Sequence, residues 1–403
     1  MNDQKSKFIL LLGSGISIPA GMPSTEAITQ KVLSGNGVMR HTDCKYYFGP
    51  PLFAHMGQPD EHIPRVVSFI SRLKTEIDDF YRHSSSYNNH VTNYEDLYYA
   101  SNQIDDCLSG EYDNPVVKAF ADKIYPDVEP LLDNRGIDKY WRLLNLVMEV
   151  NNYIKDVVRC MLVATTPKDT SYLKCIKEIC NDDMFSSVDI FTLNHDTVLE
   201  NFFVNNGIAF NDGFNKLTDN IKFWSQQSLD STGIKVRFFK LHGSINWFWV
   251  EKFINNGMKE RWIGLTLDNR SVPDIEPESG WFCDGRPLFL LGTFNKMLDY
   301  TSSIYASNQF HFYKSLDYTE RLLVCGYSFN DKGINGRIIE WLESSPNNKM
   351  LIVHGEPEDL RLKARPFISR KWKDFESQKK LICINNWIEQ VEWQEVKKVF
   401  MYD

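Results

Sequence analysis

Seven short, strongly apolar runs constrain the fold of this 403-residue chain more than any other feature. Each run is four to six residues long, and most are followed by glycine or a small polar residue. Continuous apolar runs of this length are typical of strands buried on both faces, as in a parallel sheet. The runs are Phe8–Leu12, Val188–Thr192, Val236–Leu241, Leu288–Leu291, Leu322–Cys325, Met350–Val353 and Leu381–Ile384.

Helical patterns follow several of these runs, at Thr25–Val32, Thr197–Val204 and Gly333–Leu342. Buried strands that alternate with helices predict an α/β fold. We expect a Rossmann-like, doubly wound and mostly parallel sheet.

Residues 35–185 follow a different pattern. Apolar side chains recur at three- and four-residue steps over 63–80, 141–158 and 172–179, which is typical of one buried helix face. No strand of comparable strength interrupts them. The sequence therefore predicts a helical module at 35–185, inserted into a nucleotide-binding domain made of residues 1–34 and 186–403.

Charge and cysteine usage exclude several classes of protein. The formal net charge of −8 does not suit a general polyanion binder. A basic stretch at 361–380 holds eight cations, which we interpret as a solvated helix face, so direct nucleic-acid binding is not expected. No apolar run approaches the roughly 18 residues of a membrane span, and the first run is too short for a secretion signal. The eight cysteines form no CxxC pair, so we expect reduced thiols in a cytoplasmic protein.

Ligands of an open α/β sheet bind beyond the carboxyl ends of the strands. After the first run come Gly13, Ser14 and Gly15, where the backbone can approach a ligand closely. A helix that starts near Ser24 would add free amides, so the segment suits a pyrophosphate. The alternative is a plain strand-to-helix turn, because GxGxxG is not matched (Ile18 stands at the last glycine position) and no GxxxxGK[ST] motif is present.

Two further strand ends carry polar residues. Asn194, His195 and Asp196 follow the second run, and Asp196 is also a good N-cap for the helix predicted from Thr197. His242 lies at the end of the third run. A histidine there suits proton transfer near neutral pH, although a histidine in such a place, taken singly, is more often structural.

Taken together, these three strand ends resemble the sirtuin family, in which GAGxSxxxGIP, TxNxD and HG elements occur in the same order. The resemblance covers roughly residues 7–33 and 186–355. One departure concerns zinc: protein-deacylating sirtuins carry CxxC pairs after the histidine, whereas only isolated cysteines follow His242 here, so we expect no zinc. The matching segments are Gly13–Ser17, Gly21-Met22-Pro23, Thr192–Asp196 and His242-Gly243.

Further segments resemble the bacterial sirtuin-like proteins of antiphage defence, which are similar to NAD hydrolases that deplete the cofactor during infection. The segments are Asn93-Tyr94-Glu95-Asp96, Leu241–Trp247, Leu291–Lys296 and Gly326–Asp331.

The resemblance also implies roles for individual residues. Asn194, Asp196 and His242 would be catalytic: Asn194 would orient water and ribose hydroxyls, and His242 would accept a proton. Asp196 would contact the carboxamide or favour positive charge at the sugar. The residues implied in binding NAD+ are Gly13, Ser14, Gly15 and Ser17, with Gly326, Ser328 and His354 at the adenosine half. We interpret Lys296 and Tyr300 as structural residues.

By this resemblance, we expect an NAD+ glycohydrolase that acts as an antiphage defence effector. NAD+ would be its substrate, and it would form a homo-oligomer gated by a HerA-type hexameric ATPase. Two alternatives stay open. One is an NAD-dependent protein deacylase, and the other is a catalytically silent regulatory subunit that binds NAD or ADP-ribose.

Overall fold

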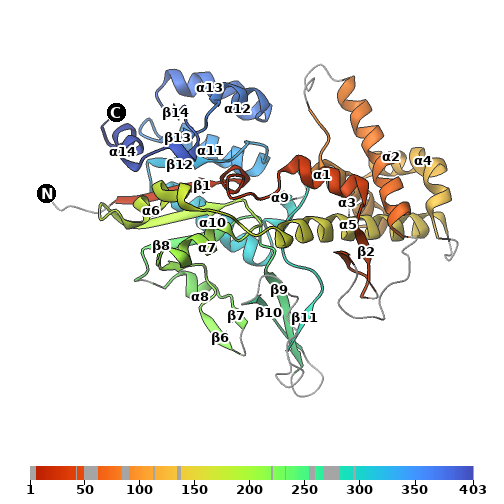
Figure 1. The fold of residues 1–403 in the computed structure, drawn as a ribbon. Helices are drawn as coiled ribbons and strands as arrows, with labels where there is room; N and C mark the ends of the chain where they lie inside the picture. Colours follow the sequence, from red (N-terminus) through yellow and green to blue (C-terminus); the bar gives the residue numbers. More distant parts are fainter. Residues whose placement is uncertain are drawn as a thin grey trace. The chain divides into compact units, whose positions relative to one another are not determined.

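The computed structural model describes residues 6–41, 43–49, 62–83, 90–111, 114–133, 138–218, 221–231, 233–253, 259–266, 281–293 and 296–402 (Figure 1). The chain divides into two compact units. A sheet unit comprises Met1–Met22, Thr165–Leu290 and Met297–Asp403, and a helical unit comprises Pro23–Ala164 and Leu291–Lys296. Helix α1 (Thr25–Ser34), which the sequence assigned to the sheet domain, groups with the helical unit.

The sheet unit is built on seven parallel strands in the order β14-β13-β12-β1-β4-β8-β5. This confirms the predicted Rossmann-like, doubly wound sheet. Six of the seven apolar runs are strands, and the short edge strand β5 was not predicted. The strands are β1 (Ser6–Leu12), β4 (Phe185–Thr192), β5 (Phe210–Asn211), β8 (Val236–Lys240), β12 (Arg321–Cys325), β13 (Lys349–Val353) and β14 (Leu381–Ile384).

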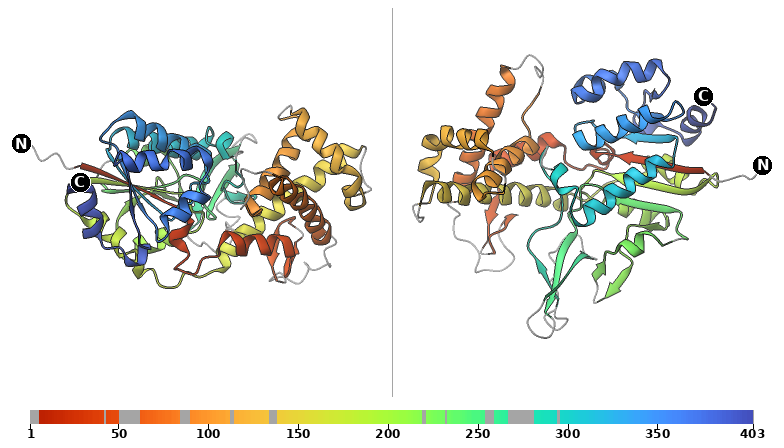
Figure 2. Two further views of the ribbon diagram at one scale, coloured as in Figure 1. Left: turned by 90° about the horizontal axis from the view of Figure 1, so that it is seen from above. Right: turned by 180° about the vertical axis from the view of Figure 1, so that it is seen from behind.

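Helices cover both faces of this sheet (Figure 2), which explains why its strands are apolar throughout. On one face, Ile9 and Leu11 join a core with α10 (Ser303–Asp317), α11 (Lys332–Ser344), α12 (Pro357–Lys363) and α13 (Pro366–Ser377). On the other face, the Phe8 ring packs edge-on against Trp393 and Phe400 of α14 (Trp393–Tyr402). Helices α6 (Lys174–Asn181) and α7 (Val198–Asn205) complete the sheet unit together with two short helices, α8 (Gln226–Leu229) and α9 (Lys296–Asp299).

The seventh apolar run, Leu288–Leu291, was wrongly predicted as a strand of this sheet. Phe289 forms only an isolated antiparallel bridge to Gly243. The Leu288 amide donates to the Trp247 carbonyl at 2.7 Å, and the Leu290 amide donates to the His242 carbonyl at 2.8 Å. The run is apolar because it is buried against the segment after β8, not because it joins the parallel strands.

A second, antiparallel sheet was missed by the sequence analysis. Its order is β11-β9-β10-β7-β6, and most of it follows His242 in the chain. The strands are β6 (Lys216–Thr218), β7 (Ile221–Phe223), β9 (Trp247–Phe253), β10 (Lys259–Thr266) and β11 (Trp281–Asp284).

Among the described residues, no group of three or more His, Cys, Asp or Glu is arranged to hold a metal ion.

The helical unit contains the expected helices over 63–80 and 141–158, whereas the one expected over 172–179 is α6 of the sheet unit. Its core includes Phe69, Ile70 and Tyr153, all fully buried. Within the described residues, no helix is both long and apolar enough to cross a membrane. The elements of the unit are α1, the hairpin β2 (Val38–Arg40) and β3 (Tyr46–Phe48), α2 (His62–Arg82), α3 (Tyr94–Ser109), α4 (Pro115–Val128) and α5 (Lys139–Ala164).

Candidate functional site

The strand order reverses direction between β1 and β12, which are neighbours in the sheet. Ligands of doubly wound sheets bind at such a switch point, beyond the carboxyl ends of the strands. Gly13 and Gly326 follow these two strands and touch through their backbones. A Cβ on Gly13 would lie 2.4 Å from the Gly326 carbonyl oxygen, and one on Gly326 (φ +67°) would lie 2.5 Å from the Ile16 nitrogen. Glycine is therefore required at both positions.

The contact between the two strand ends also involves backbone amides of the segment Gly13–Gly15. The Gly13 amide donates to the Cys325 carbonyl and the Gly15 amide to the Gly326 carbonyl, both at 2.9 Å. Two amides expected to hold a pyrophosphate are thus engaged within the fold. Ser14 is exposed. The helix expected from Ser24 belongs to the helical unit, where the Ser24 hydroxyl accepts from the Ala27 amide.

Asn194 and Ser17, which follow β4 and β1, meet in the interior. The Asn194 Nδ2 donates to the Ser17 Oγ at 3.0 Å, and both side chains are buried. The Asn194 backbone amide donates to the Thr192 Oγ1 at 3.1 Å. Within the described part of the chain, the Asn194 Oδ1 is buried without a hydrogen-bond partner. Such an atom needs an explanation, and a bound ligand or water is a common one.

Asp196 is fixed at the start of a helix. Its Oδ1 accepts from the Val198 amide at 3.0 Å, close to the capping role that the sequence offered as an alternative, although α7 begins at Val198 and not at Thr197. The buried Lys240 ammonium donates to the Asp196 carbonyl and to Glu200 Oε1. Burial raises the pKa of Glu200, and the charge of Lys240 opposes that shift.

His242 lies in a buried three-residue network with Tyr300 and Asp331. Its Nε2 is 2.8 Å from the Tyr300 hydroxyl and 3.1 Å from Asp331 Oδ2, and the Tyr300 hydroxyl donates to that same Oδ2 at 2.6 Å. Asp331 Oδ1 accepts from the Ile334 amide at 3.0 Å and so caps α11. Burial favours a higher pKa for Asp331, but the hydrogen bond and charge of His242, with the Tyr300 bond, hold it well below its usual range.

His242 and Asn194 follow adjacent strands at equivalent positions. Thr192 of β4 pairs with Lys240 of β8, so each candidate residue lies two positions beyond a paired one. The ring of His195, next to Asn194 in the chain, has its centre 6.2 Å from that of His242. The ends of β4 and β8 that carry Asn194 and His242 therefore lie side by side.

Ser328 and His354 bond within their own turns and not with this cluster. The exposed Ser328 hydroxyl accepts from the Asn330 Nδ2 at 3.1 Å. The His354 Nδ1 accepts from the Glu356 amide at 3.0 Å, and burial lowers the pKa of His354. They follow β12 and β13, on the other side of β1 from Asn194.

Sequence reasoning missed Tyr300 and Asp331 as site residues. Asp331 ends a segment already noted for its resemblance, and its position before a predicted helix was a usable signal. Tyr300 follows the four-residue helix α9 and carried no pattern of its own. The structure places the Tyr300 hydroxyl 2.8 Å from the His242 Nε2.

Two segments singled out by their resemblance, Asn93–Asp96 and Leu291–Lys296, belong to the helical unit and are joined by an ion pair. Asn93 Oδ1 accepts from the Glu95 amide at 2.8 Å and, with Asp96, completes a capping box at the start of α3. Glu95 forms an ion pair with Lys296 at 2.9 Å, with both side chains mostly buried. Residues 294 and 295 of the segment Leu291–Lys296 lie outside the described residues.

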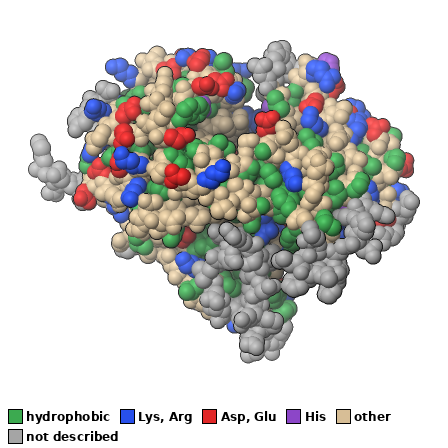
Figure 3. Space-filling model, in the orientation of Figure 1, with side chains coloured by type: hydrophobic (Ala, Val, Ile, Leu, Met, Phe, Trp, Pro, Cys, Tyr) green, Lys and Arg blue, Asp and Glu red, His purple; other side chains and the backbone are tan. Residues whose placement is uncertain are grey.

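Four of the eight cations in the basic stretch at 361–380 form ion pairs with acids. Its ion pairs join Arg361 to Glu358, Lys363 to Asp359, Lys371 to Glu343 and Lys373 to Glu358 and Glu376. Basic and acidic side chains also intermingle on the face drawn in Figure 3. These contacts support the interpretation of the stretch as a solvated helix face.

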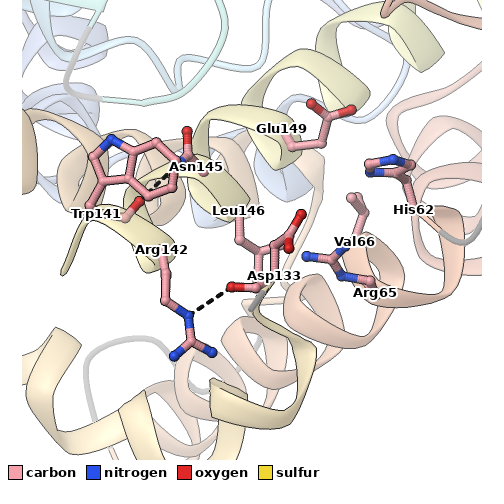
Figure 4. A pocket seen from close by; sticks show the side chains of 9 residues that line it. All are labelled: His62, Arg65, Val66, Asp133, Trp141, Arg142, Asn145, Leu146 and Glu149. Atoms are coloured by element: carbon pink, nitrogen blue, oxygen red, sulfur yellow. Dashed lines mark hydrogen bonds between the residues drawn. The ribbon is translucent and has the colours of Figure 1, made fainter. Parts of the chain in front are cut away.

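A pocket of about 400 Å³ lies in the helical unit (Figure 4). Inside it, the Arg142 Nε donates to the Asp133 carbonyl at 2.7 Å and the Arg65 Nε to the Leu131 carbonyl at 2.6 Å. No residue of the predicted site lines it. The lining residues are His62, Arg65, Val66, Asp133, Trp141, Arg142, Asn145, Leu146 and Glu149.

Comparisons with known proteins agree with the motifs. Residues 188–377 match the model of the SIR2-like domain family. This matched stretch extends from β4 through α13. No curated protein matches the chain.

Solved Sir2 structures are similar along nearly the whole chain. A Sir2 homologue in complex with NAD has 11% identity and a TM-score of 0.36, covering 98% of this chain and 90% of the other. A Sir2 bound to an acetylated peptide has 12% identity and a TM-score of 0.35, covering 98% and 92%. At such low values, the fold assignment rests on the strand order described above.

Proposed function

We propose that this protein is an NAD+ glycohydrolase that converts NAD+ and water to nicotinamide and ADP-ribose. The observation that carries the proposal is the buried, unpartnered Oδ1 of Asn194 beside the His242 network, within a SIR2-like domain. This amide oxygen suits a ribose hydroxyl or a water, because each can donate the hydrogen bond that the oxygen lacks.

In this reaction, the bond between the nicotinamide nitrogen and the ribose carbon breaks, and the oxygen of water bonds to that carbon. Nicotinamide leaves as a neutral ring, so its departure needs little acid catalysis. The demanding step is stabilisation of an oxocarbenium-like ribose with a water on its open face. Asn194 would orient that water and the ribose hydroxyls, and His242 would take the proton, directly or through a ribose hydroxyl.

Ser17 supports this role of Asn194. Its hydroxyl accepts from the Asn194 Nδ2, which fixes the amide plane and directs the carbonyl oxygen away from Ser17. Asp196, held by the Val198 amide, would contact the carboxamide or favour positive charge at the sugar.

The glycine contact fits the middle of a dinucleotide. Gly13, Gly15 and Gly326 let the ends of β1 and β12 pack closely at the switch point, where ligands of doubly wound sheets bind. Since the Gly13 and Gly15 amides are engaged, the pyrophosphate would meet other groups of the turn, of which the exposed Ser14 is one. Ser328 and His354 would lie toward the adenosine half.

The biological role that we propose rests on the resemblance of the motifs. The protein would be a cytoplasmic antiphage defence effector that depletes NAD+, and it would act as a homo-oligomer gated by a HerA-type hexameric ATPase.

Product analysis tests the proposal. The full-length protein is incubated with NAD+, with and without its genomic-neighbour ATPase and with and without an acyl-lysine peptide. We expect nicotinamide and ADP-ribose in equal amounts, independent of peptide. O-acyl-ADP-ribose formed only with peptide would identify a deacylase, and calorimetric binding of NAD+ without any product would identify a silent binding subunit.

A further inference from the structure

The arrangement of protons around His242 follows from three distances. Asp331 Oδ2 has two close neighbours, the Tyr300 hydroxyl at 2.6 Å and the His242 Nε2 at 3.1 Å, and these two lie 2.8 Å apart. All three side chains are less than 10% exposed. Two buried polar atoms this close repel when they turn only lone pairs toward each other, so each atom of the network must take part in at least one bond that carries a proton.

The Tyr300 hydroxyl has a single proton, and the carboxylate is its better acceptor. Bonds from a hydroxyl to a carboxylate are short and roughly twice as strong as neutral ones, and this contact is the shortest of the three. With that proton on the Asp331 side, the Tyr300 oxygen presents only lone pairs to His242. An Nε2 without a proton would then face acceptors on both residues, so Nε2 must carry one.

The charges around the ring favour the same arrangement. His242 is faced by Asp331 from the start of α11, by Tyr300 after α9 and by His195 after β4. The Tyr327 hydroxyl bonds to the backbone of Asp331 and not to the imidazole of His242. Burial and the charge of Asp331 raise the pKa of Tyr300 well above its usual value, so the phenol stays neutral.

We propose that Tyr300 and Asp331 are positioning residues that hold His242 in the tautomer protonated at Nε2, so that Nδ1 is the atom that accepts a proton. The catalytic part of this inference rests on the function proposed above. The tautomer itself does not, since it is inferred from the three contacts among His242, Tyr300 and Asp331. Asp331 belongs to the segment that begins at Gly326, so one short segment carries both the glycine contact and the partner of the histidine.

The direct test is ¹⁵N NMR of the full-length protein labelled at histidine, recorded above the pH at which the ring titrates. A His242→Gln variant assigns the signal. We expect a protonated Nε2 and an unprotonated Nδ1 in the wild type, with the preference for this tautomer lost or reduced in Asp331→Asn. A wild-type ring protonated at Nδ1 instead would overturn the proposal, whether or not the protein hydrolyses NAD+.

Kinetics test the consequence for turnover. Asp331→Asn keeps a good helix N-cap but removes the charge, and Tyr300→Phe removes one hydroxyl. We expect kcat to fall by about 10²–10⁴-fold in Asp331→Asn, the range known for loss of a tautomer-setting carboxylate. Because a carboxylate favours the imidazolium, the acid limb of the pH profile should also move to lower pH.

The matched control is Tyr327→Phe, which removes a hydroxyl that contacts Asp331 and Asn335 but not His242. We expect its kcat and pH profile to stay within about twofold of the wild type, whereas Tyr300→Phe lowers kcat by at least about tenfold. Two results would show that the network is only structural. One is an equal effect of the two tyrosine variants on kcat, and the other is an unchanged acid limb of the pH profile in folded Asp331→Asn. A wild type without any turnover in the presence of the candidate ATPase would instead end the proposed function and leave the NMR result to decide the tautomer.

Discussion

Asp331 Oδ2 lies 3.1 Å from His242 Nε2, although β1 and β4 separate the strands that these two residues follow. Three strand spacings amount to about 14 Å, so the segment from Gly326 to Asp331 must run along the strand ends to reach His242. The ends of four neighbouring strands, β12, β1, β4 and β8, thus contribute to one site.

Replacement of His242 by alanine should lower kcat for NAD+ hydrolysis by about 10²–10⁴-fold, the usual contribution of a positioned general base. Nicotinamide release measured by chromatography checks this. The Tyr300 hydroxyl still donates to Asp331 in the variant, so the fold should persist, and circular dichroism is the control. A folded variant with wild-type turnover would remove His242 from the mechanism.

Replacement of Ser17 by alanine should lower kcat by about tenfold, because it frees the amide of Asn194 to rotate. The effect should be smaller than that of Asn194→Ala, since Ser17 acts mainly through its 3.0 Å bond to Asn194. Steady-state kinetics on the two variants and on the double variant check the order. Additive losses in the double variant would mean that the two residues act independently.

Replacement of Gly326 by alanine should destabilise the sheet unit. Its φ of +67° strains any L-residue by about 1–3 kcal/mol, and the new Cβ would lie 2.5 Å from the Ile16 nitrogen. Gly336→Ala is the control, since a Cβ there meets nothing within 4 Å and alanine favours the α11 helix. Thermal unfolding should show a lower midpoint for the first variant only, and equal midpoints would contradict the account of the glycine contact.

The pH dependence of stability should report the ionised Asp331. Its pKa in the folded protein lies below the unfolded value of about 3.9, so its contribution is fully present above that pH and is lost as the pH falls through the folded pKa. Below about pH 4, the wild type should therefore lose more stability than Asp331→Asn as the pH falls. Urea unfolding at several pH values measures this, and parallel curves for the two proteins would argue against a depressed pKa.

The ion pair between Glu95 and Lys296 should matter for the helical unit. Removing one partner leaves a mostly buried charge, so Lys296→Met should cost about 3 kcal/mol in free energy of unfolding. The double variant Glu95→Gln with Lys296→Met should regain most of that loss. Denaturant unfolding of the three proteins checks the pair, and additive losses would show that the two residues are not coupled.

The parallel sheet was predictable because its strands are buried on both faces. Phe8 and Ile9 point to opposite faces, and both meet helices, so the whole run is apolar. The antiparallel sheet was not predictable by the same signal, since β9 and β10 mix buried residues such as Val250 with exposed ones such as Trp262. Leu288–Leu291 shows the converse: an apolar run that is buried without joining the sheet.

The pairing of site residues was predictable only where they follow adjacent strands. Asn194 and His242 come together because β4 and β8 are neighbours. The contacts of His242 with Asp331 and Tyr300 were not predictable in this way, since Asp331 follows β12, three places from β8 in the sheet, and Tyr300 lies in a segment outside the sheet. The engagement of the Gly13 and Gly15 amides likewise depends on Gly326, which is distant in sequence.

The most direct test of the central claim compares NAD+ hydrolysis by the wild type and by Asn194→Ala, each incubated with the candidate ATPase. The account predicts equimolar nicotinamide and ADP-ribose from the wild type and a loss of about 10²-fold or more in the folded variant. Unchanged hydrolysis in the variant, or no hydrolysis by the wild type with the candidate ATPase present, would contradict it.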